Sequence, residues 1–262
     1  MNPSARANDA ATLLFEARRA GTALTAFPRP APATLANAYA VQRRLCDALA
    51  LPVLGWKVGR IPAPLVASLG AERLAGPVLR CADIAGDAPG EARIFTGGAG
   101  AIEAEVMLRL GRVPDHLPPL VDAPDYVSEI RAGFEVASSP APDVHDHAPF
   151  GIIADIGINN GLLIGPALSR EGFDQLAVET RIDGASVGRG RACDVLDGPW
   201  GSLRFLVDLH LRGVIALAPG QWISAGAITG VHPIVPGQSA TASFGPAVRI
   251  ACTAVPDTGL TR

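Results

Sequence analysis

Two glutamates separated by one residue, Glu103 and Glu105, lie within an apolar run at residues 102–108. On a β-strand, residues i and i+2 point to the same face, so the two carboxylates would lie side by side. Two unpaired carboxylates repel each other unless a cation lies between them. Hard divalent cations prefer such oxygen ligands, so the spacing indicates a metal site. The alternative is an exposed strand face on which Arg109 or Arg93 pairs with the glutamates.

A third carboxylate, Glu135, lies in the apolar stretch at residues 131–137. A glutamate buried there needs a partner, and a metal shared with Glu103 and Glu105 would provide one. Pairing with Arg131 is the alternative. A set of three carboxylates suits Mg²⁺ or Mn²⁺ better than zinc.

Lys57 is the single lysine of the chain, whose lysines and arginines total 22. It lies in an apolar run between Gly55 and Gly59. A lysine offers a compact ammonium that can lose its proton when buried, whereas arginine stays planar and charged. We therefore predict that Lys57 lies beside the metal, where it holds substrate oxygens or relays protons. The alternative is a lysine at a strand edge with no chemical role.

A polar loop at residues 154–161 follows, in which Asp155 and Asn159 are candidate substrate-binding residues, although turn formation alone would equally explain them. The sequence His145-Asp146-His147 has metal-ligating residue types, but prolines flank it and a solvated loop is the favoured interpretation. The chain has no G-x-S-x-G motif, and no cysteine lies in a context that suggests a nucleophile.

The elements that must position these residues fall into two parts. Residues 9–20 and 35–49 show apolar residues at helical spacing, with Asp9 and Thr34 as N-caps. We therefore expect a helical subdomain over residues 1–52 and a β-rich catalytic domain of sandwich or barrel type over residues 53–262. One later helix is predicted at residues 203–211. Short strands are predicted at residues 53–58, 78–79, 93–95, 102–110, 152–153, 162–164, 177–182, 221–228, 239–244 and 247–254.

The composition excludes several classes of protein. Hydrophobic residues make up 48% of the 262 residues, no run is long enough for a transmembrane helix, and the net charge is −3 without a basic stripe. We therefore expect no nucleic-acid or membrane partner. The four cysteines are widely spread, and the first residues lack the apolar core of a signal peptide, so the expected location is the cytoplasm.

Together these residues resemble the fumarylacetoacetate hydrolase superfamily, and within it the branch of 2-oxopent-4-enoate hydratases and 4-oxalocrotonate decarboxylases. The motifs that carry the resemblance run in the same order over nearly the whole chain, at residues 38–42, 55–59, 103–105, 134–136, 154–165, 219–223 and 235–238. The resemblance implies an α+β fold, a mixed β-sandwich or roll of the fumarylacetoacetase C-terminal-domain type, preceded by the small helical subdomain. It also implies homo-oligomers, and Mg²⁺ or Mn²⁺ on Glu103, Glu105 and Glu135. The substrate would be a small 2-oxo acid or its dienol, which chelates the metal near Lys57.

The chain departs from this branch in its substrate pocket. Ser138 and Pro140 stand where the branch has an aspartate and an arginine, Ile156 replaces an asparagine, and Ala227 replaces a serine. The expected function is a metal-dependent hydratase like those that act on 2-oxopent-4-enoate. The alternatives are a 4-oxalocrotonate-type decarboxylase, an acylpyruvate-type C–C hydrolase, and a catalytically weak paralogue that binds the ligand.

Overall fold

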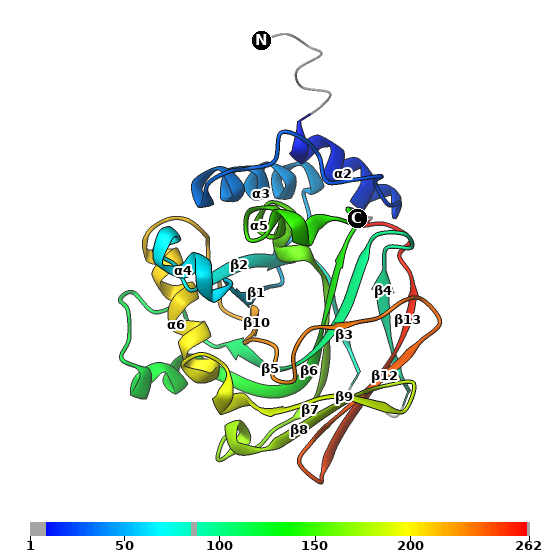
Figure 1. The fold of residues 1–262 in the computed structure, drawn as a ribbon. Helices are drawn as coiled ribbons and strands as arrows, with labels where there is room; N and C mark the ends of the chain where they lie inside the picture. Colours follow the sequence, from blue (N-terminus) through cyan, green and yellow to red (C-terminus); the bar gives the residue numbers. More distant parts are fainter. Residues whose placement is uncertain (1–8, 85–87, 261–262) are drawn as a thin grey trace.

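Two mixed β-sheets face each other, and a layer of helices covers one end of them (Figure 1). The computed structural model describes residues 9–84 and 88–260. Within these residues one sheet has eight strands, ordered β2-β1-β10-β5-β6-β7-β3 with β11 paired to β5, and the other has five, ordered β4-β13-β12-β8-β9. The α-helices are α2 (Ala10–Ala20), α3 (Leu35–Leu49), α4 (Ala63–Leu69), α5 (Phe150–Ala154) and α6 (Gly198–Leu211). None of the helices among the described residues is long and apolar enough to cross a bilayer.

The strands of the larger sheet are β1 (Gly55–Arg60), β2 (Arg73–Val78), β3 (Cys81–Asp83), β5 (Ala99–Leu110), β6 (Val127–Ser139), β7 (Asn159–Ala167), β10 (Trp222–Ser224) and β11 (His232–Pro233). Those of the smaller sheet are β4 (Gly90–Ile94), β8 (Ala177–Ile182), β9 (Ala185–Arg191), β12 (Ser239–Phe244) and β13 (Val248–Pro256). Short 3₁₀ turns are η1 (Leu120–Tyr126), η2 (Val144–His147), η3 (Ile156–Ile158), η4 (Phe173–Gln175) and η5 (Ala192–Asp194). The predicted combination of β-sheets with a few helices is thus confirmed.

The two faces of the central strand β5 have different surroundings: one packs into the main hydrophobic core, and the other carries the site residues. Its even-numbered residues, such as Val106 and Leu108, are buried in the main hydrophobic cluster, which also includes residues of the smaller sheet and of α6. Its odd-numbered residues point to the other face, where Met107 joins a separate small cluster. The period of two predicted from the sequence therefore holds, and it places Glu103 and Glu105 together on the face away from the main core.

The two predicted N-terminal helices are present as α2 and α3. The Thr34 hydroxyl caps α3 by accepting a hydrogen bond from the Asn37 backbone N–H at 3.2 Å. Asp9 stands at the N-cap position of α2 but makes no capping hydrogen bond, and its carboxylate pairs instead with Arg44 at 2.8 Å. A second hydrophobic cluster joins Leu14 and Leu45 of these helices to the loop before α5. The predicted domain boundary after residue 52 stays a prediction. The first eight residues of the predicted helical subdomain lie outside the residues that the structure describes.

Three predicted elements need correction. Residues 152–153, predicted as a strand, lie in α5, because two isoleucines are too short a run to distinguish the period of a strand from that of a helix. The predicted strand at 221–228 is limited to Trp222–Ser224, since Gly226 at φ +116° turns the chain away. The predicted helix at 203–211 begins earlier, at Gly198, where Pro199 supplies the fixed φ that suits a first helical turn.

Candidate metal centre

Strand pairing brings three glutamates together. Glu103 on β5 lies directly opposite Glu135 on β6, and Glu105 follows two residues along β5 on the same face. All three are buried, and each offers a carboxylate oxygen within 4.8 Å of those of the other two. The sequence predicted the shared face of Glu103 and Glu105, but the pairing with Glu135 depends on a register that spans about thirty residues of chain.

Hydrogen bonds fix two of these carboxylates and leave one oxygen of each free. The Glu105 Oε2 atom accepts hydrogen bonds from the Ser224 hydroxyl at 2.5 Å and the Gly226 backbone N–H at 2.8 Å. The Glu105 Oε1 and Glu135 Oε2 atoms are buried without a hydrogen-bond partner in the described part of the chain. Oriented carboxylates with free oxygens are what a divalent cation requires, so these residues fit Mg²⁺ or Mn²⁺. Ser224 at the end of β10 and Gly226 just after it were not predicted, because they lie more than a hundred residues further along the chain.

Lys57 and Asn159 both reach Glu135. The Lys57 Nζ atom lies 3.1 Å from Glu135 Oε1, and the Asn159 side-chain amide donates to the same oxygen at 3.1 Å. The predicted neighbourhood of Lys57 and the carboxylates is therefore present. Asn159, predicted to bind substrate, holds a carboxylate in place here, and its role toward substrate stays a prediction.

The centre holds more negative than positive charge. Burial, reinforced by the charge of Glu135, raises the pKa of Glu103 to about 7, although Lys57 opposes the rise. Burial and then repulsion from Glu135 and Glu103 raise the pKa of Glu105 well above its usual range. Burial alone would lower the pKa of Lys57, but the glutamates, Glu135 first, outweigh it and raise the pKa above its usual range. A divalent cation would neutralise the excess carboxylate charge.

The arginines considered as alternative partners are occupied elsewhere. Arg109 pairs with Glu129 at 2.5 Å, and Arg131 pairs with Glu129 at 3.0 Å and with Asp83 at 3.3 Å. Arg93 pairs with Glu91 at 3.1 Å. The interpretation of the glutamates as members of surface ion pairs is therefore wrong.

Asp155, the other predicted substrate-binding residue, forms a buried ion pair. Its Oδ1 atom lies 2.5 Å from Arg18 Nε of α2, and both side chains are fully buried. Arg18 also donates to the backbone oxygens of Ser138 at 3.1 Å and Asn159 at 3.3 Å. The pair thus fastens α2 to the strands that carry the site. Asp155 is not among the residues that line the cavity at Lys57 and Glu103, and its contact with substrate stays a prediction.

A cavity of about 340 Å³ opens above Lys57 and Glu103. Most of its walls are apolar, and its other ionisable side chains are Arg60, Arg73, His145 and Asp194. Two cavities of about 680 Å³ lie elsewhere, but neither is lined by Lys57 or by any of the three glutamates. We therefore assign the smaller cavity to the site, because Lys57 and Glu103 line it, although Glu105 and Glu135 do not. The apolar lining residues are Val58, Leu74, Ile152, Ile158, Val195, Leu196, Ala225, Ala227, Ile228 and Val231.

Comparison with solved structures shows which fold this is. The chain matches 4-oxalocrotonate decarboxylase from Pseudomonas putida G7, complexed with magnesium and adipate, at a TM-score of 0.76 and 22% identity, over 97% of this chain and 99% of that one. It matches fumarylpyruvate hydrolase from Pseudomonas aeruginosa, in complex with Mn²⁺ and pyruvate, at a TM-score of 0.57 and 16% identity, over 77% of this chain and 89% of that one.

The fold is that of the fumarylacetoacetate hydrolase superfamily. A structure of 2-hydroxyhepta-2,4-diene-1,7-dioate isomerase from Mycobacterium marinum is also similar, with a TM-score of 0.56 and 17% identity, over 78% of this chain and 76% of that one. Neither family models nor curated sequences match the chain. The resemblance inferred from the motifs is therefore confirmed at the level of the fold, including the β-roll of the fumarylacetoacetase type.

Proposed function

We propose that this chain is a divalent-metal-dependent lyase that acts on a small 2-oxo acid or its dienol. The observation that carries the proposal is the set of buried glutamates, two of them with an unpartnered oxygen, beside Lys57 at an apolar cavity. Glu103, Glu105 and Glu135 would hold Mg²⁺ or Mn²⁺. The structurally similar enzymes, complexed with magnesium and adipate or with Mn²⁺ and pyruvate, support this assignment.

The residues around the cavity have distinct tasks in this proposal. When bound, the cation supplies Lewis-acid stabilisation of the negative charge that develops on the 2-oxygen of the substrate. Ser224 and Gly226 hold Glu105 in the ligating orientation. Lys57 stays protonated, because the glutamates raise its pKa, and its ammonium donates hydrogen bonds to substrate oxygens. The apolar walls exclude water, which strengthens these electrostatic contacts.

Hydration is the first candidate reaction, as expected from the sequence. A proton and a hydroxyl group from water add across the conjugated alkene of the dienol, and a 4-hydroxy-2-oxo acid results. Atoms balance with water as the only co-reactant, so the reaction needs no redox cofactor.

Decarboxylation is the second candidate. The likeness to 4-oxalocrotonate decarboxylase extends over almost the whole of both chains, whereas the likeness to the hydrolase covers 77% of this one. The mostly apolar cavity walls also favour the loss of a carboxylate as neutral carbon dioxide, because an ionised carboxylate is poorly solvated there.

A substrate panel followed by ultraviolet absorbance tests the proposal. The panel contains 2-hydroxypenta-2,4-dienoate, 4-oxalocrotonate and an acylpyruvate, each with and without Mg²⁺ or Mn²⁺, and the products are identified by NMR. We expect metal-dependent loss of one compound, and the product distinguishes water addition from carbon dioxide release. Consumption of the acylpyruvate would favour the hydrolase. If metal is bound but none of the compounds is consumed, the result would contradict a catalytic role with these substrates and favour a ligand-binding paralogue.

A further inference from the structure

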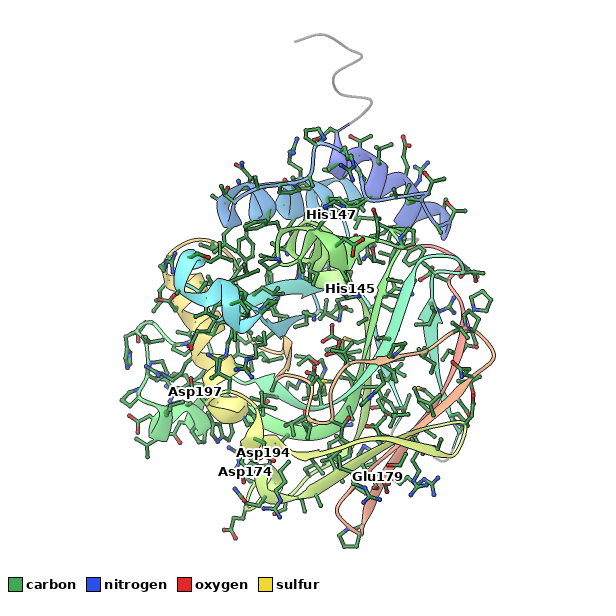
Figure 2. The ribbon with its side chains drawn as sticks, in the orientation of Figure 1. His145, His147, Asp174, Glu179, Asp194 and Asp197 are labelled. Carbon is green, nitrogen blue, oxygen red and sulfur yellow. The ribbon has the colours of Figure 1, made fainter. Side chains whose placement is uncertain are left out.

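Two histidines of the same 3₁₀ turn have different environments. His147 lies 3.6 Å from the Asp143 carboxylate, and its ring is 4.9 Å from that of Phe27. His145 lines the cavity of the proposed active site, whereas His147 does not. Figure 2 shows His145 on the side of α5 that faces the strands, and His147 on the side toward α2 and α3. The interpretation of this sequence as a solvated loop therefore does not account for His145, which lines the cavity.

The His145 imidazole is available for proton transfer. Within the described residues its side chain has no hydrogen bond or ion pair, and it is exposed at the cavity edge. It can therefore meet a molecule in the cavity on one side and exchange protons with water on the other. An imidazole has one ring nitrogen that can accept a proton and one that can donate a proton, which suits a group that both gives and takes a proton.

The other ionisable groups of the cavity are less suited to this task. Lys57 is held as an ammonium against Glu135, and Glu103 belongs to the proposed metal centre. Arg60 and Arg73 end in guanidinium groups, which donate hydrogen bonds but have no acceptor nitrogen to take a proton. The Asp194 carboxylate is occupied, because it accepts a hydrogen bond from the Arg191 backbone N–H at 3.2 Å.

We propose that His145 is the general acid–base residue that transfers the proton between the substrate carbon next to the 2-oxo group and solvent. This proposal rests on the proposed function. In the enolising direction the C3 proton moves to an imidazole nitrogen, the C–H electron pair forms the C2–C3 double bond, and the carbonyl electron pair moves to the 2-oxygen. In the reverse direction the imidazolium returns a proton to C3.

Exchange of the C3 protons of 2-oxopentanoate in D₂O, followed by NMR in the presence of Mg²⁺, tests the step without knowledge of the natural substrate. The matched variants are His145→Gln and His147→Gln, with folding checked by circular dichroism. We expect His145→Gln to slow exchange about 100-fold and added imidazole to restore part of the rate, because general acid–base groups contribute on that scale. His147→Gln should stay within about threefold of the wild type, because its ring lies outside the cavity.

Two further measurements do not depend on turnover. With Mg²⁺ bound, unreactive oxalate should shift the ring-proton NMR signal of His145 and leave that of His147 in place, each signal being assigned by its loss in the matching variant. Mn²⁺ affinity should be unchanged in His145→Gln.

The outcomes separate this proposal from the one on which it rests. Exchange at the wild-type rate in His145→Gln, or a His145 signal that oxalate does not move, would overturn the role of His145 alone. Absence of metal-dependent exchange in the wild type with Mn²⁺ bound would overturn the proposed function, and the role of His145 with it.

Discussion

At the scale of single residues, the site depends on buried carboxylates that the protein alone does not neutralise. Glu103, Glu105 and Glu135 share one ammonium, that of Lys57, which contacts Glu135. Burial of like charges is unfavourable unless the groups are protonated or bind a cation. Repulsion among the three buried carboxylates therefore destabilises the metal-free folded state, and metal binding would remove this destabilisation.

We predict that Glu105→Gln abolishes activity and metal-induced stabilisation while the metal-free protein becomes more stable. The amide is uncharged, so the substitution removes one of three repelling carboxylates, and its oxygen can still accept from Ser224 and Gly226. Thermal unfolding with and without Mn²⁺ measures both effects. Unchanged turnover in this variant would exclude the metal assignment.

Lys57→Arg is predicted to lower turnover by about 100-fold or more while metal affinity is kept, because the planar guanidinium cannot occupy the place of the ammonium. The lysine stem is enclosed tightly, and a Cβ built at Gly157 would lie only 2.9 Å from its Cδ. Steady-state kinetics and Mn²⁺ titration separate the two properties. Wild-type rates would mean that the single lysine has no chemical role.

The sequence indicates some of these residues and hides others for a physical reason. Glu103 and Glu105 are visible because a strand has a period of two, and Glu135 because a lone carboxylate interrupts an apolar run. Ser224 was missed because its contact with Glu105 joins strands 119 residues apart. The flanking prolines favour a solvated loop for His145, but they do not show which cavity that loop borders.

At the scale of elements, Gly157 of the turn η3 and Gly76 of strand β2 let these two segments approach closely beside Lys57. Gly157 has φ +69°, and a Cβ there would lie 2.8 Å from the Gly76 Cα atom and 2.9 Å from Lys57 Cδ. The close approach of these two backbone segments therefore determines where the lysine side chain can lie.

We expect Gly157→Ala to displace Lys57 and lower turnover by about 10- to 100-fold, since small misplacements in an active site have effects of this size. Gly184→Ala is the matched control, because Gly184 also has a positive φ, +81°, but a Cβ there would meet nothing within 4 Å. Each variant should lose about 1–2 kcal/mol of stability from the backbone conformation alone. Equal kinetics in the two variants would contradict a positioning role for Gly157.

The buried pair of Arg18 and Asp155 gives a second prediction at this scale. Arg18→Met leaves Asp155 buried without its partner and should reduce the free energy of unfolding by about 3–5 kcal/mol. Arg19→Met is the control, since Arg19 is exposed on the same helix and should change stability by less than about 0.5 kcal/mol. Urea unfolding measures both, and a similar loss in the two variants would mean that the ion pair does not hold α2 in place.

Element prediction succeeded where a period could be read. Residues 9–20 and 35–49 show the helical period over three or four turns, and the structure has helices there. It failed at α5, where five residues are too few to show any period. The helical period does not reveal that Arg18 is buried, because its partner Asp155 lies 137 residues away.

At the scale of the whole molecule, the charge of the centre makes stability depend on pH. The pKa of Glu103 is about 7 in the folded chain against an ordinary 4.5, so between these values the folded state binds more protons than the unfolded state. The stabilisation from this group is complete below about pH 4.5 and is lost as the pH rises through 7. The raised pKa of Glu105 acts in the same direction.

We therefore predict that the Tm of the metal-free protein falls between pH 5 and pH 8, and that Mg²⁺ or Mn²⁺ raises Tm more at pH 8 than at pH 5. Glu103→Gln is the control for other titrating groups, and its Tm should fall less over the same range. Calorimetry at several pH values measures this. Parallel curves for the wild type and the variant would contradict the buried-charge account.

The fold as a whole was predictable in class but not in strand order. Glycine and proline between short apolar runs predicted sheets, and the motif order indicated the family fold that the comparisons confirm. The placement of β10 between β1 and β5, which brings Ser224 to Glu105, follows from packing among distant segments that no local pattern records.

The most direct test of the central claim is a titration of the metal-free protein with Mn²⁺, followed by electron paramagnetic resonance, with and without oxalate. The account predicts one tight site per chain, tighter with oxalate, and an affinity at least about 100-fold weaker when Glu105 or Glu135 is replaced by glutamine. Tight binding that survives both substitutions, or no tight binding at all, would contradict the metal centre and the function built on it.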